Sequence, residues 1–579
     1  MARPPVAGES AKDRSEGTPL IVGLGVLAVC ATLTRQADGS SAIPAWAGAL
    51  LQGPLVAAWL ARQVGWRQRD NLRRPPATER VLTAIVILSG VATAIARGSA
   101  DAFFIATTTF VWGCLAVDYL GGLLRRVEAL IATPALMIRA IIGPWAMLTV
   151  LTTILLSLPL ATRPGLPDYA YNFWLHVLNS FYSAISTSCL VGGGVYSFGE
   201  DYSSFGQAVI FTTTQLAGLA FSAIGLAILQ PFLRTPVALR WMILFSVILQ
   251  LLAVAVMWSA WSASDADGPV GRFWWGLVHS GNALLNSGWT IRADGFAAYL
   301  GRSRVFATLA TLSIVGSIGM PVIMGFAAGK RQTSAATVRK SLPPARPWQK
   351  LPWLEVVTTL ALLSSVAVFI FVMETPRILP AAMAPSRPVD FGENRVSIRD
   401  NMTHQERWGL SLFTSCTLRS AGLQSIPLSE GAISWPTYVL MLGCMFVGGS
   451  AAGVAGGVRV SSVLLLAIVL FSTTEGWKVL PDGAALRRKL RRGLLNFIAC
   501  WLGVSFAVVL LLALLTDGTW YELIFEPIAA VNGVGLSTGL SLHLTSAGRL
   551  VMILAMVAGK WMPATFLLRQ SAALARVAS

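Results

Sequence analysis

Four short segments of this 579-residue chain join small or polar residues to a glycine. They read STSCLVGG (186–193), NALLNSGW (282–289), CTLRSAGL (416–423) and AVNGVGL (530–536). Glycine permits backbone conformations that turn carbonyl oxygens toward a common point, and a ring of carbonyl oxygens can replace the hydration shell of a cation. A half-helix before such a segment also directs its partially negative end at the ion. The segments therefore predict a cation selectivity filter.

The same order of elements surrounds each segment. A long apolar helix precedes it and a second long apolar helix follows it, and this unit occurs four times from residue 138 onward. An internal repeat of this kind fixes the architecture. Because each middle segment is too short to cross a bilayer twice, we expect it to enter the membrane and turn back. Backbone of that kind is tolerated at membrane depth only inside protein or beside a wet cavity, so four re-entrant segments predict a central polar path.

The predicted fold is an all-α polytopic membrane protein. It has four repeats of helix, re-entrant pore loop and helix around a central pore, after an N-terminal bundle of about four transmembrane helices, judged by length and apolarity. The expected domains are an accessory bundle over residues 1–130 and pore repeats over residues 131–235, 236–345, 346–480 and 481–579.

Composition and charge placement agree with a membrane location. The chain is 55% hydrophobic and 12% charged, far from the range of soluble domains. In a soluble protein a net charge of +17 would suggest nucleic-acid binding. Here, however, the basic residues cluster in alternate connections between the apolar runs, for example at 62–80, 330–350 and 487–492. This asymmetry follows the positive-inside rule. We therefore expect a multi-pass protein of the inner (cytoplasmic) membrane with both termini cytoplasmic, and no nucleic-acid partner.

Residues typical of enzymes and metal sites are sparse in this sequence. The six cysteines have no CxxC spacing and no pair of the four histidines has ligand spacing, so we predict neither a disulfide framework nor a zinc site. No Gly-rich nucleotide motif follows a strand. We therefore expect no enzyme activity and no cofactor.

A second Gly-rich stretch, residues 448–457, lies within a long apolar run. Each interior glycine costs a helix about 1 kcal/mol relative to alanine, so the run cannot form one regular helix without cost. The stretch is either irregular backbone beside a cavity or a kink that serves only helix packing, and we favour the first because irregular backbone at membrane depth needs a cavity. Lys560 lies in the last apolar run, where a lone charge is expensive in lipid, and we expect it to face a wet cavity.

Several of these stretches resemble the Trk/Ktr/HKT superfamily of potassium transporters. The similar stretches are FTSCTLRSAGLQSI (413–426), MFVGGSAAGVAGGVRVS (445–461), FEPIAAVNGVGLSTGLS (525–541) and HSGNALLNSGW (279–289). The first loop is the least similar, because CLVGGG (189–194) replaces the Thr-Val-Thr-Gly-like filter of the family. Four loops in the right order, from residue 138 to the C-terminus, carry the resemblance.

The resemblance implies roles for particular residues. The implied filter residues are Cys189, Leu190, Val191 and Gly192; Asn286, Ser287 and Gly288; Ser420, Ala421 and Gly422; and Gly533, Val534 and Gly535. The implied gate residues are Gly448, Gly449, Gly453, Gly456, Gly457 and Lys560, the last at a position where the family usually has arginine. The first filter glycine could instead be Gly193 or Gly194. Glycine at all four positions goes with potassium preference in the superfamily.

The expected function is therefore potassium uptake through this filter and gate, with K+ as the transported ion and the lipid bilayer as surroundings. The resemblance also implies a homodimer and a separate cytosolic nucleotide-binding regulatory subunit of the TrkA/KtrA kind. The altered first filter leaves a sodium-conducting or cation-coupled symporter of the same fold as an alternative. A non-conducting membrane sensor or membrane enzyme is another; it would need clustered intramembrane Asp, Glu or His, and the sequence has no such cluster.

Overall fold

The computed structural model describes residues 134–163, 172–229, 239–261, 268–325 (with gaps at 293–294, 297–298 and 300–301), 351–374, 404–471 (with gaps at 420, 427 and 429–432) and 484–578. All of them belong to one compact unit, residues 128–579. The predicted accessory bundle, residues 1–130, lies outside the described residues, and so does Ser420 of the predicted filter.

The described part of the chain is helical, as the apolar runs predict. In chain order the main helices are α5 (Pro134–Leu156), α7 (Phe173–Ser188), α8 (Ser204–Leu229), α9 (Leu239–Met257), α10 (Gly268–Leu284), α11 (Ser303–Ile318), α14 (Leu351–Glu374), α15 (His404–Thr417), α16 (Trp435–Phe446), α17 (Val460–Phe471), α18 (Ala484–Leu515), α19 (Trp520–Val531) and α21 (Ser546–Ala578). Short elements lie between them, namely the 3-10 helices η1 (Pro159–Ala161) and η3 (Trp258–Ala260) and the one-turn helix α20 (Leu540–His543). Within the described ranges, β pairing is limited to two isolated bridges.

In the part of the chain that the structure describes, five stretches are long and apolar enough to cross a membrane. They are Ser204–Leu229, Leu239–Ala260, Pro352–Glu374, Leu490–Leu515 and Ser546–Gln570. Burial divides them into two kinds: 61% of the most apolar part of α8 and 56% of that of α21 is buried inside the protein, against 22% for α18. The exposed side of α18 carries large apolar residues such as Phe506 and Leu514, which suits contact with lipid. We therefore place α8 and α21 in the interior and α18 at the periphery.

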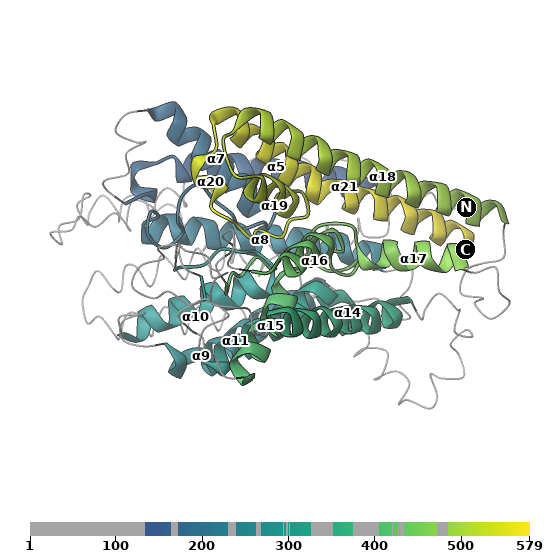
Figure 1. The fold of residues 1–579 in the computed structure, drawn as a ribbon, viewed down its shortest axis with the longest axis horizontal. Coiled ribbons are helices and arrows are strands. Elements are labelled where there is room, and N and C mark those ends of the chain that lie inside the picture. The colour runs from purple at the N-terminus through teal and green to yellow at the C-terminus, as the bar shows by residue number, and fades with distance from the viewer. Residues whose placement is uncertain are drawn as a thin grey trace, which may run out of the picture. The chain divides into compact units, whose positions relative to one another are not determined.

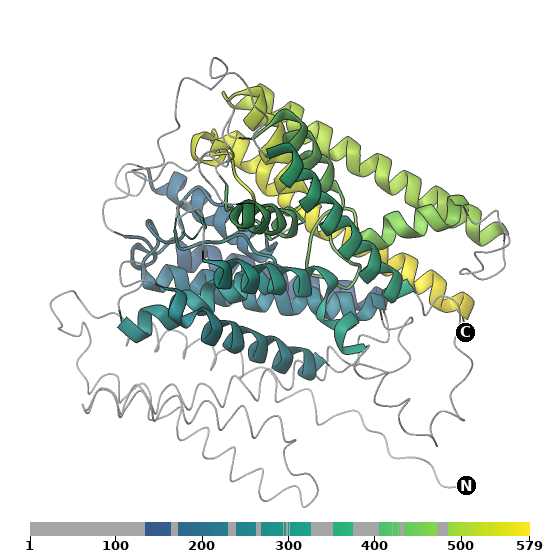
Figure 2. The same cartoon turned by 60° about the horizontal axis from the view of Figure 1, so that its bottom comes forward.

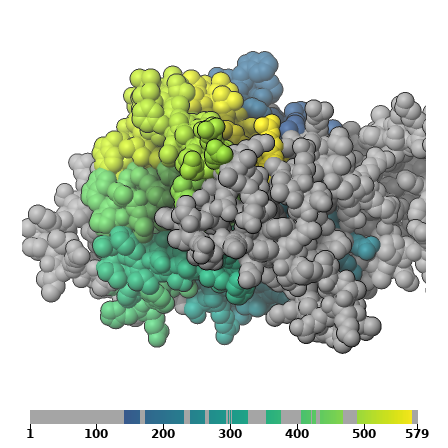
Figure 3. All heavy atoms as spheres, turned by 90° about the vertical axis from the view of Figure 1, so that its right-hand side faces the viewer, coloured from purple at the N-terminus to yellow at the C-terminus, as the bar shows by residue number. Residues whose placement is uncertain are grey.

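The helices form four sets that contact one another in a closed order. The sets are α5, α7 and α8; α9, α10 and α11; α14 to α17; and α18, α19 and α21. Between sets, α8 contacts α10, α11 contacts α15, α16 contacts α19, and α21 contacts α7 and α5. Figures 1 and 2 show the last set, in yellow-green, beside the first set, in blue, although they are distant in sequence. The space-filling view gives the same neighbourhood, with yellow and blue atoms adjacent at the top (Figure 3).

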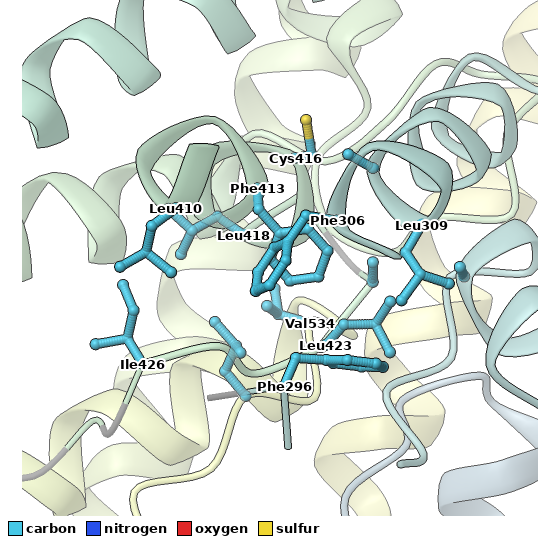
Figure 4. Packing of buried hydrophobic residues seen from close by; sticks show 14 of the residues in the cluster. Phe296, Phe306, Leu309, Leu410, Phe413, Cys416, Leu418, Leu423, Ile426 and Val534 are labelled. Carbon is cyan, nitrogen blue, oxygen red and sulfur yellow. The ribbon is translucent and has the colours of Figure 1, made fainter. Parts of the chain in front are cut away.

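A shared apolar core joins three of these sets. Phe306 of α11 and Phe413 of α15 meet edge to face with ring centroids 4.6 Å apart, and Phe296 lies close to both Leu423 and Phe413 (Figure 4). Val534, which follows α19, belongs to the same cluster. Because residues that follow the short helices α15 and α19 pack into one core, the ends of these helices are held near each other.

Candidate functional site

Three of the short helices end in the same backbone turn. The turn residues Leu190, Asn286 and Gly533 have φ of 57°, 51° and 63°, the left-handed region. Each donates its N–H to a carbonyl three residues earlier, at 3.0, 3.3 and 3.1 Å, and the next residue donates to a carbonyl five residues earlier, at 2.8 Å in all three. This hydrogen-bond pair is a Schellman motif. Three different sequences therefore build one local geometry, two residues before each predicted filter glycine.

The turn after α15 differs in detail. Leu418 donates to the Thr414 carbonyl at 2.9 Å, and both Ala421 and Gly422 donate to the Thr417 carbonyl, at 3.0 and 3.3 Å. Gly422 itself has φ of 61°. The chain after α15 thus also folds back onto the end of its own helix.

The four predicted filter glycines Gly192, Gly288, Gly422 and Gly535 meet in a ring. Gly288 donates its N–H to the Val191 carbonyl at 3.2 Å. A methyl group added to Gly288 would lie 3.0 Å from the Gly422 Cα atom, and one added to Gly422 or Gly535 would overlap the carbonyl of Val534 or Val191. The neighbours therefore run first to second, second to third, third to fourth and fourth back to first. We call these segments the glycine ring.

The glycine ring requires glycine for two reasons. Gly192, Gly422 and Gly535 have φ of 88°, 61° and 79°, a region that residues with a Cβ atom rarely adopt. An added Cβ atom on Gly192, Gly422 or Gly535 would also overlap backbone of a neighbouring segment, and one on Gly288 would lie 3.0 Å from the Gly422 backbone, a tight contact. Backbone of all four segments therefore meets at this point, and the carbonyl oxygens of Val191, Gly422 and Val534 lie there at close range. Carbonyls gathered in this way can serve as cation ligands.

The structure separates the three glycines that the sequence offers for the first segment. A Cβ atom on Gly192 would collide with the Gly288 backbone, whereas one on Gly193 would meet nothing within 4 Å. Gly194 lies against the ring of Trp289, 2.6 Å from the added atom. Of the three, Gly192 is thus the residue whose position touches another predicted filter glycine.

Indole groups brace the ring from behind. Trp145 of α5 donates its Nε1–H to the Ser188 carbonyl at 3.0 Å, and Trp501 of α18 donates to Asn532 Oδ1 at 3.1 Å. Trp289, next to a ring glycine, donates to Thr187 Oγ1 at 3.2 Å. A buried donor that is left without an acceptor costs stability, so these bonds fix both the indoles and the helix ends that they contact.

The Gly-rich stretch interrupts a helix at the predicted place. Helix α16 ends at Phe446 and α17 begins at Val460, and residues 447–459 form a loop that we call the Gly-rich segment. Its ends are tied together, since Gly448 donates to the Val458 carbonyl at 2.9 Å and Val458 donates to Phe446 at 3.1 Å. The backbone groups released by the helix break therefore find partners inside the protein, as the membrane interior requires.

This segment touches all four sets of helices. Ser450 donates its N–H to the Ser317 carbonyl of α11 at 2.9 Å, and Gly225 of α8 lies against the Ala452 carbonyl. Gly456 lies against the Asn532 carbonyl, with its added Cβ 3.1 Å from the Gly533 Cα atom. The contact with the third set comes from Arg419, which follows α15 and donates to the Gly448 carbonyl. The Gly-rich segment therefore lies at the base of the glycine ring.

Three buried cations bind carbonyls of this segment. Besides Arg419, Arg459 donates to the carbonyls of Ser450 and Gly453 at 3.1 and 2.7 Å. Lys560 of α21 donates to the Val454 carbonyl at 2.5 Å, and its ammonium lies 5.0 Å from the centre of the Phe221 ring. Lys560 is 1% exposed, so it points at the segment and away from lipid. Charged donors of this kind make the stronger class of hydrogen bond.

Two buried acids were missed by sequence reasoning. Glu526 of α19 accepts bonds from Ser537, Thr538 and Ser541, which hold the chain that leaves the fourth ring segment. Glu355 of α14 accepts from Ser450 Oγ at 2.5 Å. Both are acids inside apolar stretches, and the rule that an intramembrane ionisable residue marks a functional position would have found them.

Comparisons with known proteins agree with one another. Residues 234–575 match the family model described as TrkH, cation transport protein. The chain is 25% identical over 443 residues to the Ktr system potassium uptake protein B of Bacillus subtilis, covering 72% of this chain and 89% of that protein. It is 23% identical over 436 residues to the potassium/sodium uptake protein NtpJ of Enterococcus hirae, covering 70% and 86%.

A solved structure has a similar fold. The crystal structure of the potassium transporter TrkH from Vibrio parahaemolyticus aligns with a TM-score of 0.51 and covers 85% of this chain and 96% of that one. Its sequence identity is 15%, so this likeness bears on fold alone. The family match begins after the first ring segment, the segment whose sequence departs furthest from the resemblance noted above.

Proposed function

The chain belongs to the TrkH family of cation transport proteins, and from this premise we propose that it takes up potassium across the cytoplasmic membrane. It is a membrane transporter and not an enzyme. The relatives named above are a potassium and a potassium/sodium uptake protein. The observation that carries the proposal is the glycine ring, in which four segments contribute backbone at one point.

In the proposed mechanism the four sets of helices are pore repeats around one path. Ions lose water in the glycine ring, where carbonyl oxygens replace the hydration shell. The helices α7, α10, α15 and α19 direct their C-terminal ends at this point, which favours a cation. In this structure the Val191 carbonyl accepts a bond from Gly288, which ties the first and second segments to each other.

The Gly-rich segment acts as the gate in this proposal. It lies at the base of the ring, touches all four repeats and is bound by Lys560 through the Val454 carbonyl. An ion that leaves the ring meets this segment next. Its displacement would break bonds made by side chains while leaving the helix-end turns of the ring intact.

Glycine at each ring position favours potassium, the preference that goes with this pattern in the superfamily. A sodium-conducting or cation-coupled protein of the same fold is the second candidate, because CLVG at 189–192 departs from the usual first filter and because the relative NtpJ is named for both ions. The two candidates differ in which ion competes for uptake.

We extend the proposal to surroundings and partners by the family resemblance. The protein forms a homodimer that binds a cytosolic nucleotide-binding regulatory subunit. Both termini are cytoplasmic, which fits the basic residues at the start of α18, of which Arg488, Arg491 and Arg492 are exposed. We also propose that the pore repeats are residues 131–235, 236–345, 346–480 and 481–579, as the sequence predicts. No cofactor is needed for this function.

Uptake of rubidium-86 into proteoliposomes holding the purified chain tests the proposal. We expect unlabelled potassium to suppress uptake and sodium at the same concentration to leave most of it. Gly422→Ser should weaken this discrimination, because the added side chain would collide with the Val534 carbonyl. Equal competition by sodium would favour the second candidate, and absence of uptake would contradict transport by the chain alone.

A further inference from the structure

Ser450 is the residue of the Gly-rich segment with the most directed contacts. Its N–H donates to Ser317 at 2.9 Å, its carbonyl accepts from Arg459 at 3.1 Å, and its hydroxyl donates to Glu355 at 2.5 Å. It is 1% exposed. The N–H of this serine thus ties the segment to α11 and its hydroxyl ties it to α14, whereas its carbonyl is bound within the segment.

Glu355 reaches the segment from a different helix than Lys560 does. Helix α14 buries one stripe of residues at helical spacing, and Glu355 and Glu374 are its two acids on that stripe, each 3% exposed. They are 19 residues apart on the helix, or about 28 Å at 1.5 Å per residue, close to the thickness of a hydrocarbon core. Glu355 therefore lies near the start of α14 and Glu374 at its end.

Both acids accept a hydrogen bond from a serine hydroxyl, but the two serines lie in different segments. Glu374 accepts from the N–H and the hydroxyl of Ser434, at 3.0 and 2.7 Å, at the start of α16. Glu355 accepts from Ser450 in the Gly-rich segment, where Arg459 is its electrostatic partner. A buried carboxylate is costly unless it is paired and hydrogen-bonded, so Glu355 favours the position of the segment in which Ser450 donates to it.

We propose that Glu355 is a positioning residue that holds the gate closed through the hydroxyl of Ser450. The inference rests on the proposed function, and it adds a second restraint to the one supplied by Lys560. Lys560 on α21 binds the segment at Val454 and Glu355 on α14 binds it at Ser450, so two charges of opposite sign fix it from two helices. Movement of the segment must break or carry along both bonds.

The test compares basal rubidium-86 uptake by two matched pairs of variants of the full chain in proteoliposomes, without any regulatory subunit. Ser450→Ala and Glu355→Gln alter the contact with the Gly-rich segment. Ser434→Ala and Glu374→Gln alter the equivalent contact at the other end of α14. We expect Ser450→Ala to raise basal uptake about tenfold, the factor that corresponds to a hydrogen bond to a charged group, and Glu355→Gln to raise it less because its amide oxygen still accepts.

Two further readings separate a gating role from a structural one. Thermal unfolding in detergent measures any loss of stability. A loss of stability would lower rubidium uptake, whereas release of the gate would raise rubidium uptake. The double variant Glu355→Gln with Ser450→Ala should match Ser450→Ala alone, since both changes remove one contact. Competition by sodium should stay as in the parent, because the glycine ring is not altered.

The proposal is supported if uptake rises in the Ser450 and Glu355 variants and stays within about twofold of the parent in the Ser434 and Glu374 variants. The two contacts lie at opposite ends of α14, and contacts that are far apart act independently. Unchanged or reduced uptake in Ser450→Ala, while the parent takes up rubidium, overturns the role of Glu355 and leaves transport standing. Absence of uptake by the parent overturns the proposed function and this inference together. If Glu355→Gln fails to fold, Ser450→Ala, which removes a single oxygen atom, decides.

Discussion

The glycine ring and the Gly-rich segment are both irregular, glycine-dependent backbone, yet they differ in whether charged side chains bind their carbonyls. The turns of the ring are closed by backbone bonds that span three to five residues. The Gly-rich segment is held by side chains that are 29, 95 and 106 residues away from their partners, namely Arg419, Glu355 and Lys560. Local backbone bonds form with the helix itself, whereas distant side-chain bonds can be exchanged without unfolding a helix. The contrast is consistent with the proposal that the Gly-rich segment is the gate, because its restraints come from charged side chains on other elements.

The largest effect is expected where the ring has no space. Gly535→Ala adds a methyl group that overlaps the Val191 carbonyl and places a Cβ atom at φ of 79°. We expect rubidium uptake to fall about 100-fold, since left-handed strain and overpacking together reach about 3 kcal/mol. Gly193→Ala is the matched control, because its methyl group would meet nothing within 4 Å. Equal losses in both variants would contradict a fixed ring at Gly192 to Gly535.

The next effect should have the opposite sign. Lys560→Met keeps an apolar chain of similar length but removes the bond to the Val454 carbonyl and the charge beside Phe221. We expect basal uptake to rise about tenfold, the factor for one charged hydrogen bond. The measurement is the initial rate of rubidium uptake at equal protein incorporation. A fall in uptake with an unchanged melting temperature would show that the segment is not restrained by Lys560.

A smaller effect is expected at the junction of the two regions. Trp501→Phe removes the N–H that binds Asn532 Oδ1, next to Gly456 and Gly533. We expect the ratio of potassium to sodium competition to fall about fivefold, corresponding to about 1 kcal/mol for one neutral hydrogen bond. Trp520→Phe, in the exposed stack with Trp435, serves as the control. If both variants keep the ratio of the parent, the indole does not brace the ring.

The smallest effect should lie outside both regions. Thr519 and Glu522 form a reciprocal capping box at the start of α19. Thr519→Ala should cost about 1 kcal/mol of stability and leave the ion competition unchanged, because the cap lies at the far end of the helix from the ring. Thermal unfolding measures the first quantity and rubidium competition the second. A changed competition ratio would show that the ring depends on the whole of α19.

What could be predicted from the sequence follows the same division. The ring segments and the helix break at residues 447–459 were predictable because glycine placement and apolar runs are local signals. The choice of Gly192 over Gly193 and Gly194 depends on where Gly288 comes to lie, which only the fold determines. The bond of Glu355 to the segment was not predicted, since partners 95 residues apart share no periodic pattern. Dimerisation, the regulatory subunit and the residue roles stay predictions.

The closed order of the four sets also bears on how such a protein can change over generations. In a ring built from identical subunits, one substitution appears at every corner at once. Here each corner is encoded separately, as the different sequences before Gly192, Gly288, Gly422 and Gly535 show. A single codon change alters one of the four ring segments and leaves the sequences of the other three unchanged. The divergent first segment is the kind of asymmetric, stepwise adjustment that a one-chain ring allows.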